Sequence, residues 1–229
     1  MMLLRRRAMM GGAESLTGKL GSLSAGTKVQ VGSLSFIVVH QGNPDKSIYD
    51  ASCDGTWLLM SDYYEERVWD SRNNYADSNI ASWLASTFMG IFSGTVKASI
   101  LPVKIPYYYN GSLHTLSNGF DCQAFLPAAV ELGILPESNY NVPADGKTLE
   151  YFVGTNPNIG TSGADAKRGG TSGRYWTRTA STENTDDVFN CSSAGAVSVR
   201  DSSFSYGARP VIIMDKYTPI DGDEIAIVE

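Results

Sequence analysis

The side chains best suited to catalysis are few and widely separated in this sequence. Cys53, Cys122 and Cys191 are its three cysteines, and no two of them form a Cys-x-x-Cys pair. This spacing favours three buried thiols over a metal site or a disulfide framework. A serine hydrolase would combine one of the two histidines, His40 or His114, with a Gly-x-Ser-x-Gly nucleophile motif. The chain has no such motif. The sequence therefore predicts no catalytic residues and no cofactor.

The stretch from residue 173 to 214 has the composition of a binding surface held on a rigid frame. It opens with Tyr175 and Trp176, whose large faces anchor a core, and it closes with an apolar run at 211–214. Residues 179–187 and 202–206 are small, polar, acidic or aromatic, which is typical of exposed loops. Tyr, Ser and Asn are also the residue types that paratopes favour. The predicted ligand contacts are Arg178, Ser181, Glu183, Asn184, Asp186, Asn190, Asp201, Ser203, Phe204 and Tyr206.

Upstream patterns predict the strands that carry this stretch. Residues 27–40 alternate as a β-hairpin with a turn at 32–33, and residues 56–60 resume as an apolar strand. Residues 104–116 predict a second hairpin, because Asn110-Gly111 is a dipeptide that tolerates positive φ in a tight turn. Strand alternation in this hairpin leaves at least one of its tyrosines facing away from the core.

One long helix is expected at residues 78–92, where apolar side chains recur at steps of three and four. Ser78, or Asp77 beside it, is positioned to cap the first turn, and Trp83 is expected to point inward. A shorter helix is expected at 124–132.

The chain after this second predicted helix lacks regular patterns. Gly133 is placed to cap the helix at its C-terminus. Residues 139–173 are expected to form a long irregular stretch. Near the end, Arg209 precedes Pro210 where the last strand begins. If buried, its guanidinium must be paired, because an unpaired buried charge is costly.

The end of the chain resembles the closing half of a C-type-lectin-like domain. The residues that carry this resemblance are Tyr-Trp-x-Arg at 175–178, Gly195 with the strand after it, and Gly-x-Arg-Pro at 207–210. Ser-Asn-Ile-Ala-Ser-Trp-Leu at 78–84 adds to it. That segment is similar to a helix of an uncharacterised bacterial and prophage domain family with the formylglycine-generating-enzyme variant of this fold. The match covers residues 27–214.

The resemblance implies an α+β, C-type-lectin-like fold with short hairpins, one or two helices and long loops. It also implies a non-enzymatic ligand-binding or display domain of a phage or prophage structural protein, acting in tail-associated receptor binding or head decoration. A variable protein diversified by a retroelement is one version, since such proteins place their changing residues in this terminal segment. The alternative is a cellular enzyme-derived or carbohydrate-binding domain of the same fold.

The expected partners follow from the same resemblance. They are a host cell-surface protein or glycan, or other virion proteins. The chain is also expected to form a homo-oligomer, and analogy with display proteins favours a trimer. The expected location is the virion, after synthesis in the host cytoplasm. The alternative location is the bacterial cytoplasm or cell surface.

Two activities of related folds are excluded by their missing residues. Formylglycine-generating enzymes depend on two cysteines a few residues apart, whereas Cys191 has no second cysteine within sixty residues. Calcium-dependent lectins carry Glu-Pro-Asn, Gln-Pro-Asp or Trp-Asn-Asp, and the chain has none of these. One alternative stays open, a hard cation held by Glu183, Asp186 and Asp187, because such ions take several oxygen ligands.

Composition narrows the class of protein further. Of 229 residues, 42% are hydrophobic and 18% are charged, which indicates a folded domain rather than a disordered chain. A net charge of −6 argues against nucleic acid as a partner, which needs a concentrated basic face. No apolar run is long enough to predict membrane insertion.

Three parts of the chain are distinguished by composition. Residues 1–26 are basic and interrupted by glycines, which predicts an N-terminal arm for attachment or oligomerisation. Residues 27–214 form the predicted C-type-lectin-like domain, and residues 215–229 an acidic tail. The alternative for both ends is a solvated segment without a partner.

Overall fold

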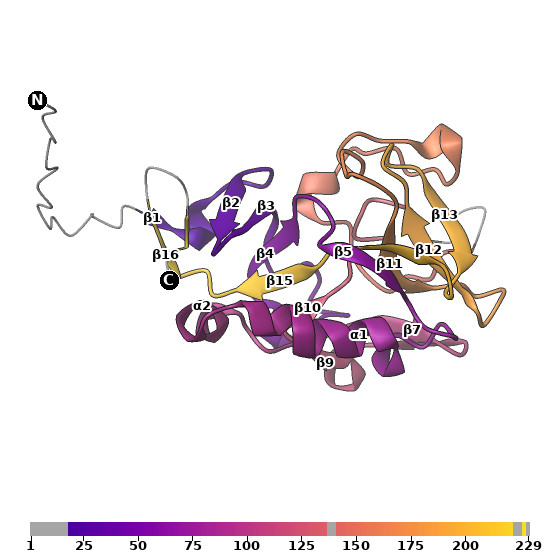
Figure 1. Ribbon diagram of the computed structural model, residues 1–229, viewed down its shortest axis with the longest axis horizontal. Helices are drawn as coiled ribbons and strands as arrows, with labels where there is room; N and C mark the ends of the chain where they lie inside the picture. Colours follow the sequence, from indigo (N-terminus) through magenta and orange to yellow (C-terminus); the bar gives the residue numbers. More distant parts are fainter. Residues whose placement is uncertain (1–17, 137–140, 222–225, 228–229) are drawn as a thin grey trace, which may run out of the picture.

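The computed structural model describes residues 18–136, 141–221 and 226–227. Two main sheets lie side by side along the longest axis of the molecule, and a run of short helices passes beneath them (Figure 1). Most of the regular structure is strand, and the few helices are short. The predicted α+β class is confirmed.

The first sheet has six strands and holds the apolar centre of the chain. In spatial order they are β10 (Ala124–Phe125), β15 (Val211–Met214), β4 (Gly55–Met60), β3 (Leu34–Gly42), β2 (Lys28–Val31) and β17 (Ala226–Ile227). Every residue of β4 and β15 is buried, as expected for central strands covered on both faces. The hairpin of β2 and β3, with Gly32 at φ 58°, confirms the predicted one.

The second sheet has five strands and carries the predicted ligand contacts. In spatial order they are β13 (Val197–Asp201), β12 (Asp187–Cys191), β11 (Tyr175–Ala180), β14 (Ser205–Ala208) and β5 (Glu65–Val68). Central β11 is buried along its whole length. A Cβ on Gly207 of β14 would lie 2.3 Å from the Tyr63 ring, so this position requires glycine.

A two-stranded ribbon joins the two sheets. β4 pairs with β15 in the first sheet, and their chain neighbours β5 and β14 pair in the second. Arg209 lies where the ribbon bends, is buried, and donates hydrogen bonds to the carbonyl oxygens of Met60, Ser61 and Arg168. The predicted need for a buried, paired guanidinium is met by backbone carbonyls.

The single helix predicted at 78–92 is a series of short helical segments, and a further helix follows it. This helical run contains α1 (Asn79–Trp83), a π-helical turn (Leu84–Phe88), a 3-10 turn (Met89–Ile91) and α2 (Gly94–Ser99). The Ser78 hydroxyl caps α1 by accepting from the amide of Ala81 at 3.2 Å, and Trp83 points inward. Both predictions are confirmed.

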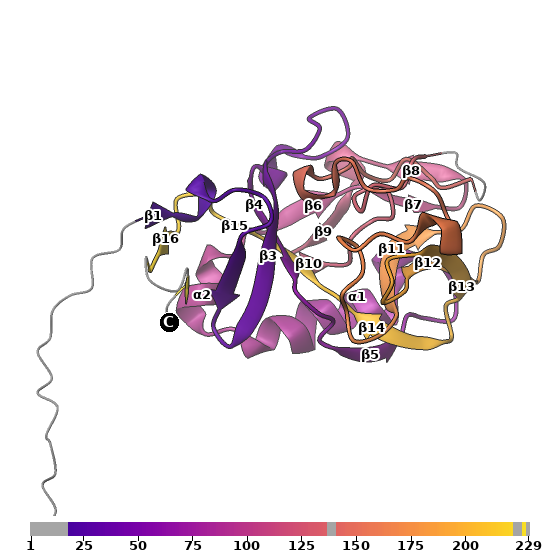
Figure 2. The same cartoon turned by 90° about the horizontal axis from the view of Figure 1, so that it is seen from above.

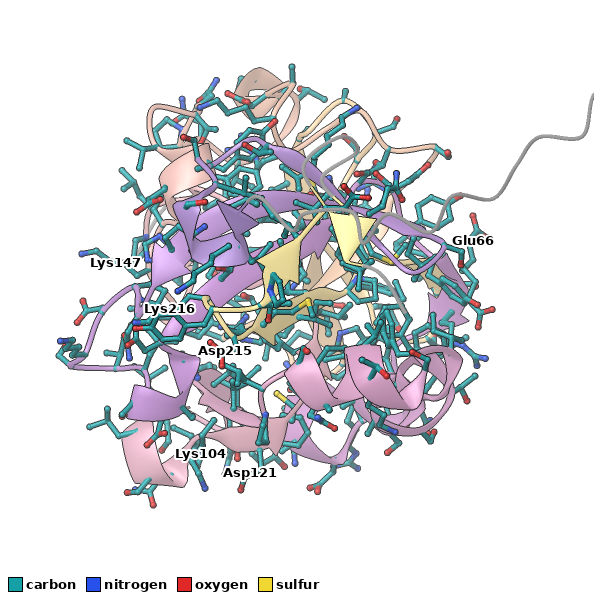
Figure 3. The ribbon with its side chains drawn as sticks, turned by 90° about the vertical axis from the view of Figure 1, so that its left-hand side faces the viewer. Glu66, Lys104, Asp121, Lys147, Asp215 and Lys216 are labelled. Carbon is teal, nitrogen blue, oxygen red and sulfur yellow. The ribbon has the colours of Figure 1, made fainter. Side chains whose placement is uncertain are left out.

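Two small sheets complete the core around the helical run. β6 (Val103–Ile105) pairs with β9 (Phe120–Cys122), and β7 (Tyr107–Tyr109) pairs with β8 (Ser112–His114). Asn110 and Gly111 both have positive φ in the turn between β7 and β8, as predicted. An ion pair of 2.9 Å between Lys104 and Asp121 joins β6 to β9 (Figure 3).

The helix predicted at 124–132 is wrong. Ala124 and Phe125 form β10, and only a single turn follows, which ends at Gly133 with φ 87°. Pro127 has no amide hydrogen, the amide of Ala128 binds the side chain of Glu131 three residues later, and the amide of Ala129 binds the distant side chain of Thr179 instead of a helix carbonyl. Residues 141–173 are irregular, as expected, apart from the 3-10 turns Glu150–Phe152 and Thr161–Gly163.

The ends of the described chain pack against the first sheet. β1 (Gly18–Lys19) pairs with β16 (Pro219–Ile220), and Leu20 is fully buried (Figure 2). The predicted boundaries at 27 and 214 therefore fall inside packed structure. The rest of the predicted arm, residues 1–17, lies outside the described residues, and its role in attachment or oligomerisation stays a prediction. No helix in the described part of the chain has the length and apolar character needed to cross a bilayer.

Replacing Trp176 by alanine should destabilise the fold by about 3–5 kcal/mol, because a fully buried aromatic side chain is removed. Urea denaturation measures this change in the free energy of unfolding. Tyr217→Ala, at a ring that is 64% exposed, is the matched control and should change it little. Equal losses in the two variants would contradict a core role for Trp176.

Candidate ligand-binding site

Two connections of the second sheet lie side by side at one end of it. Residues 181–186 join β11 to β12, and residues 202–204 join β13 to β14. The amide of Ser202 donates to the carbonyl of Asp186 at 2.7 Å, which links the two loops directly. We call these two connections the loop end of the sheet; it lies at the right of Figure 1. Residues separated by about 20 positions in the sequence thus form one surface.

Most of the predicted contacts are exposed at the loop end. Phe204 is 52% exposed, and its ring stacks on Tyr206 with 6.0 Å between centroids and 12° between planes. Tyr206 is half-buried and packs on Trp176 at 4.7 Å. The guanidinium of Arg174 lies 5.6 Å from the Tyr206 ring. The other exposed contacts are Glu183, Asn184, Asp186, Asp201 and Ser203.

Three predicted contacts are buried, so their prediction as ligand contacts is corrected. Arg178 and Asn190 have no exposed surface, and Ser181 is 9% exposed. Arg178 lies on β11, whose residues are all buried, so its side chain is enclosed in the core. Asn190 instead supports the surface, because its Oδ1 accepts from Arg174 Nη1 and from the hydroxyl of Ser198.

Arg178 forms a buried ion pair with Glu131. Its Nη1 and Nη2 donate to the two carboxylate oxygens of Glu131 at 2.7 and 2.6 Å. The Tyr49 hydroxyl and the amide of Ala128 also donate to this carboxylate, at 2.7 and 2.8 Å. The carboxylate thus accepts two hydrogen bonds from Arg178, one from the distant Tyr49 and one from the nearby amide of Ala128, and the guanidinium compensates its negative charge.

The remaining Arg178 donors bind backbone carbonyls of three further segments. They reach Pro106, Leu126 and Asp145 at 2.9–3.0 Å. A Cβ on Gly146 would lie 2.9 Å from Glu131 Cγ and 3.0 Å from the Tyr49 hydroxyl oxygen, so a glycine lets the loop close over the pair. The pair therefore fixes the irregular segments that surround β11.

Asp145 is a second buried carboxyl beside this pair. Its Oδ1 accepts from the Thr179 hydroxyl at 3.1 Å, and its Oδ2 has no hydrogen-bond partner among the described residues. Burial raises the pKa of Asp145 to about 7 and outweighs the opposing effect of Arg178. The carboxyl is therefore protonated in mildly acidic solution.

Both histidines pack against aromatic rings. His40 packs edge-on against Trp57, with 6.4 Å between ring centroids, and burial lowers its pKa. His114 stacks on Tyr107 at 4.6 Å. Both rings are therefore accounted for by packing.

The cysteines and acidic residues complete the inventory of reactive groups. Cys53 and Cys191 are buried free thiols, whereas Cys122, predicted to be buried, is partly exposed. Burial raises the pKa of Cys53 to about 12, which disfavours the reactive thiolate. Among residues 18–136, 141–221 and 226–227, no three His, Cys, Asp or Glu side chains are placed to hold a metal ion. The alternative of a cation site at the loop end is not supported.

Residues far away in the sequence complete the surface and were not predicted as contacts. A cleft of about 260 Å³ lies between residues 181–185 and the turn that joins β7 to β8, and Arg72 and Tyr108 contribute to its lining. Asn73 lies beneath: its Nδ2 donates to the carbonyls of Ser181, Asn184 and Asp187. On the β7–β8 side of this cleft, the expected exposed tyrosine in residues 107–109 was the sequence signal, and on the other side Ser181, Glu183 and Asn184 were predicted contacts.

The family model of a domain of unknown function, DUF6273, matches residues 54–216, and the chain belongs to this family. The matched region contains the joining ribbon, the whole second sheet, the Glu131–Arg178 pair and the loop end. No curated protein and no solved structure matches the chain.

Replacing Arg178 by methionine should destabilise the fold by about 3–5 kcal/mol, because the variant leaves Glu131 as a buried carboxylate without its counter-ion. Urea denaturation measures the loss. Arg200→Met is the matched control, since Arg200 is exposed and bonds only a neighbouring carbonyl. A stability equal to that of the control would contradict the role given to the pair.

Asp145→Asn should change how stability depends on pH. The pKa of Asp145 is raised in the folded state, so between about pH 4 and 7 the folded chain holds a proton that the unfolded chain releases. The free energy of unfolding therefore falls as pH rises through this window. The variant lacks this dependence, so its free energy of unfolding relative to that of the natural protein should rise as pH increases from 5 to 8. Urea denaturation at each pH measures the difference.

The control for this effect is Asp201→Asn. Hydrogen bonds from Ser203 lower the pKa of the exposed Asp201, so its contribution is lost only in more acidic solution. Its denaturation curves should shift in parallel with those of the natural protein from pH 5 to 8. Parallel shifts for Asp145→Asn as well would contradict the raised pKa.

Proposed function

We propose that the chain is a non-enzymatic, C-type-lectin-like binding domain that presents the loop end of its second sheet to a macromolecular partner. The observation that carries this proposal is the exposed Phe204 ring, stacked on Tyr206 among polar side chains. A large apolar ring in water costs free energy that a partner recovers by covering it. Aromatic residues surrounded by short polar groups are also typical of recognition surfaces.

The packing beneath these rings favours binding with little loss of side-chain conformational entropy. Tyr206 rests on the buried Trp176, whose indole nitrogen donates to the carbonyl of Arg67 at 3.0 Å. Arg174 is held by Asn190 and the Ser198 hydroxyl. Side chains that are already ordered lose less entropy on binding, which increases affinity for a given contact area.

Several residues that carry the C-type-lectin resemblance have structural roles in this chain. Trp83 packs under the guanidinium of Arg67, which lies 4.7 Å from its ring, and Arg209 holds the bend between the sheets. Cys191 is buried with its pKa raised by burial, which disfavours the cysteine chemistry of formylglycine-generating enzymes. The buried thiol of Cys191 supports a binding domain over an enzyme-derived one.

The more specific proposal is a phage or prophage structural protein whose partner is a host cell-surface protein or glycan. The sequence resemblance supports it, as does the division between an exposed loop end and a buried frame. Residues 182–186 are exposed, whereas Val188, Phe189 and Asn190 next to them are buried. Such a division lets contacts vary without loss of the fold, as a retroelement-diversified protein requires. An adjacent reverse transcriptase gene with a near-identical template repeat would identify that version.

Phe204→Ala and Tyr206→Ala should each weaken binding to bacterial envelope fractions by about 1–4 kcal/mol, because both rings lie at the proposed contact. Binding is measured by biolayer interferometry, and the Tm of each variant by calorimetry. Tyr217→Ala, between β15 and β16, removes an exposed ring outside the loop end and should leave binding unchanged. Variants at Phe204 and Tyr206 that keep full affinity would show that the contact surface lies elsewhere.

A further inference from the structure

Arg174 is a half-buried cation that two neighbouring strands hold on one face of the second sheet. Trp176, Asn190 and Ser198 are aligned across β11, β12 and β13, so their side chains share that face. Arg174 precedes Trp176 by two residues and lies on the same side. Its Nη1 donates to the Oδ1 of Asn190 and, at 2.8 Å, to the hydroxyl of Ser198. These bonds fix one edge of the guanidinium, and we call Arg174, Asn190 and Ser198 the Arg174 cluster.

The opposite edge of this guanidinium is unused. Its Nε and Nη2 carry three N–H groups. Neither atom has a hydrogen-bond partner among residues 18–136, 141–221 and 226–227. The Nδ2 of Asn190 is buried and also lacks a partner in this part of the chain. The Arg174 cluster therefore has nitrogen donors to spare, and what it lacks is a hydrogen-bond acceptor.

Arg174 is not neutralised by a carboxylate of the described chain, since none forms an ion pair with it. Asp187 and Asp201 are cross-strand neighbours. Each lies three residues from a member of the Arg174 cluster, an odd number of steps that places it on the opposite face of the sheet. Glu65, on β5, bonds Arg67 at 2.7 Å instead. The positive charge of Arg174 is therefore available to a partner.

The free edge of Arg174 fits a carboxylate next to an apolar group. The Nε and Nη2 donors form a planar fork that matches the two oxygens of a carboxylate. One guanidinium balances the single charge of a carboxylate, whereas a phosphate monoester carries more than one negative charge. The Tyr206 ring lies 5.6 Å from the guanidinium, and Phe204 stacks on Tyr206. An acidic side chain beside an apolar one in a protein segment has this combination.

We propose that Arg174 binds an Asp or Glu side chain of a protein partner, while Tyr206 and Phe204 cover an apolar side chain next to it. This inference rests on the proposed binding function and names the chemical group that the surface beside Tyr206 recognises. Because Asn190 and Ser198 already hold the guanidinium, its orientation costs little on binding. Lysine lacks the planar fork and should not replace it.

The first test compares variants in binding to bacterial envelope fractions by biolayer interferometry. Arg174→Gln and Arg174→Lys should each weaken binding about tenfold, since both lose the bidentate contact. Arg200→Gln is the matched control. Arg200 is exposed, follows Ser198 by two residues on the same face of β13, and bonds only the neighbouring carbonyl of Val199. It carries the same charge without the anchoring bonds, and its variant should bind normally.

The second test uses the natural protein, so it holds even where a variant fails to fold. Two blocked tetrapeptides, acetyl-Gly-Phe-Glu-Gly-amide and acetyl-Gly-Glu-Phe-Gly-amide, are titrated while NMR records the arginine Nε–H resonances. The Arg174→Lys spectrum identifies the resonance of Arg174. At least one peptide should shift it, with a Kd on the order of 1 mM, as expected for so few contacts. The versions with Gln in place of Glu should bind about tenfold more weakly.

Several outcomes would overturn the inference. Full affinity in Arg174→Lys, or equal losses in Arg174→Gln and Arg200→Gln, would show that charge alone acts. No shift with either peptide, or a shift only with inorganic phosphate or sialyllactose, would exclude a protein carboxylate. If Arg174 variants bind envelope fractions normally but Phe204→Ala does not, only this inference fails. If Phe204→Ala also binds normally, the proposed function fails with it.

Discussion

The buried pair of Glu131 and Arg178 is the interaction on which the rest of the structure depends. A chain with so much irregular backbone leaves many carbonyl oxygens without a strand or helix partner, and burying them unpaired is costly. Buried guanidinium groups solve this problem repeatedly here. Arg178, Arg168 and Arg209 each donate to backbone carbonyls from at least two separate segments. Only Arg178 also has a carboxylate partner, and that pair fixes the segments packed around the central strand.

Local patterns in the sequence predicted the elements that depend on local physics. The hairpin of β2 and β3, the Asn110-Gly111 turn and the helical run from Asn79 were predicted because turn chemistry and apolar spacing decide them. Residues 124–132 were predicted wrongly because a distant hydroxyl, that of Thr179, binds an amide that a helix would need. The burial of Arg178 was missed for the same reason, since its carboxylate partner lies 47 residues earlier.

The candidate site, too, was predicted from the sequence only in its local features and not in its long-range contacts. The composition of residues 179–187 and 202–206 predicted exposed polar and aromatic loops, and most of these residues are exposed in the structure. Nothing in the sequence linked these loops to Asn73, which lies 108 residues before Ser181 and binds three of their carbonyls. Long-range contacts of this kind depend on the packed fold, so a pattern confined to one stretch cannot reveal them.

The strands β1 and β16 lie at the opposite end of the longest axis from the loops between β11 and β14 (Figures 1 and 2). This separation sets the geometry of presentation. A support joined to the chain beside β1 or β16 would leave the loop end of the second sheet pointing outward and free of steric hindrance. Many copies fixed to one surface at this end would then turn the same face to their surroundings, so that weak individual contacts would combine into avidity.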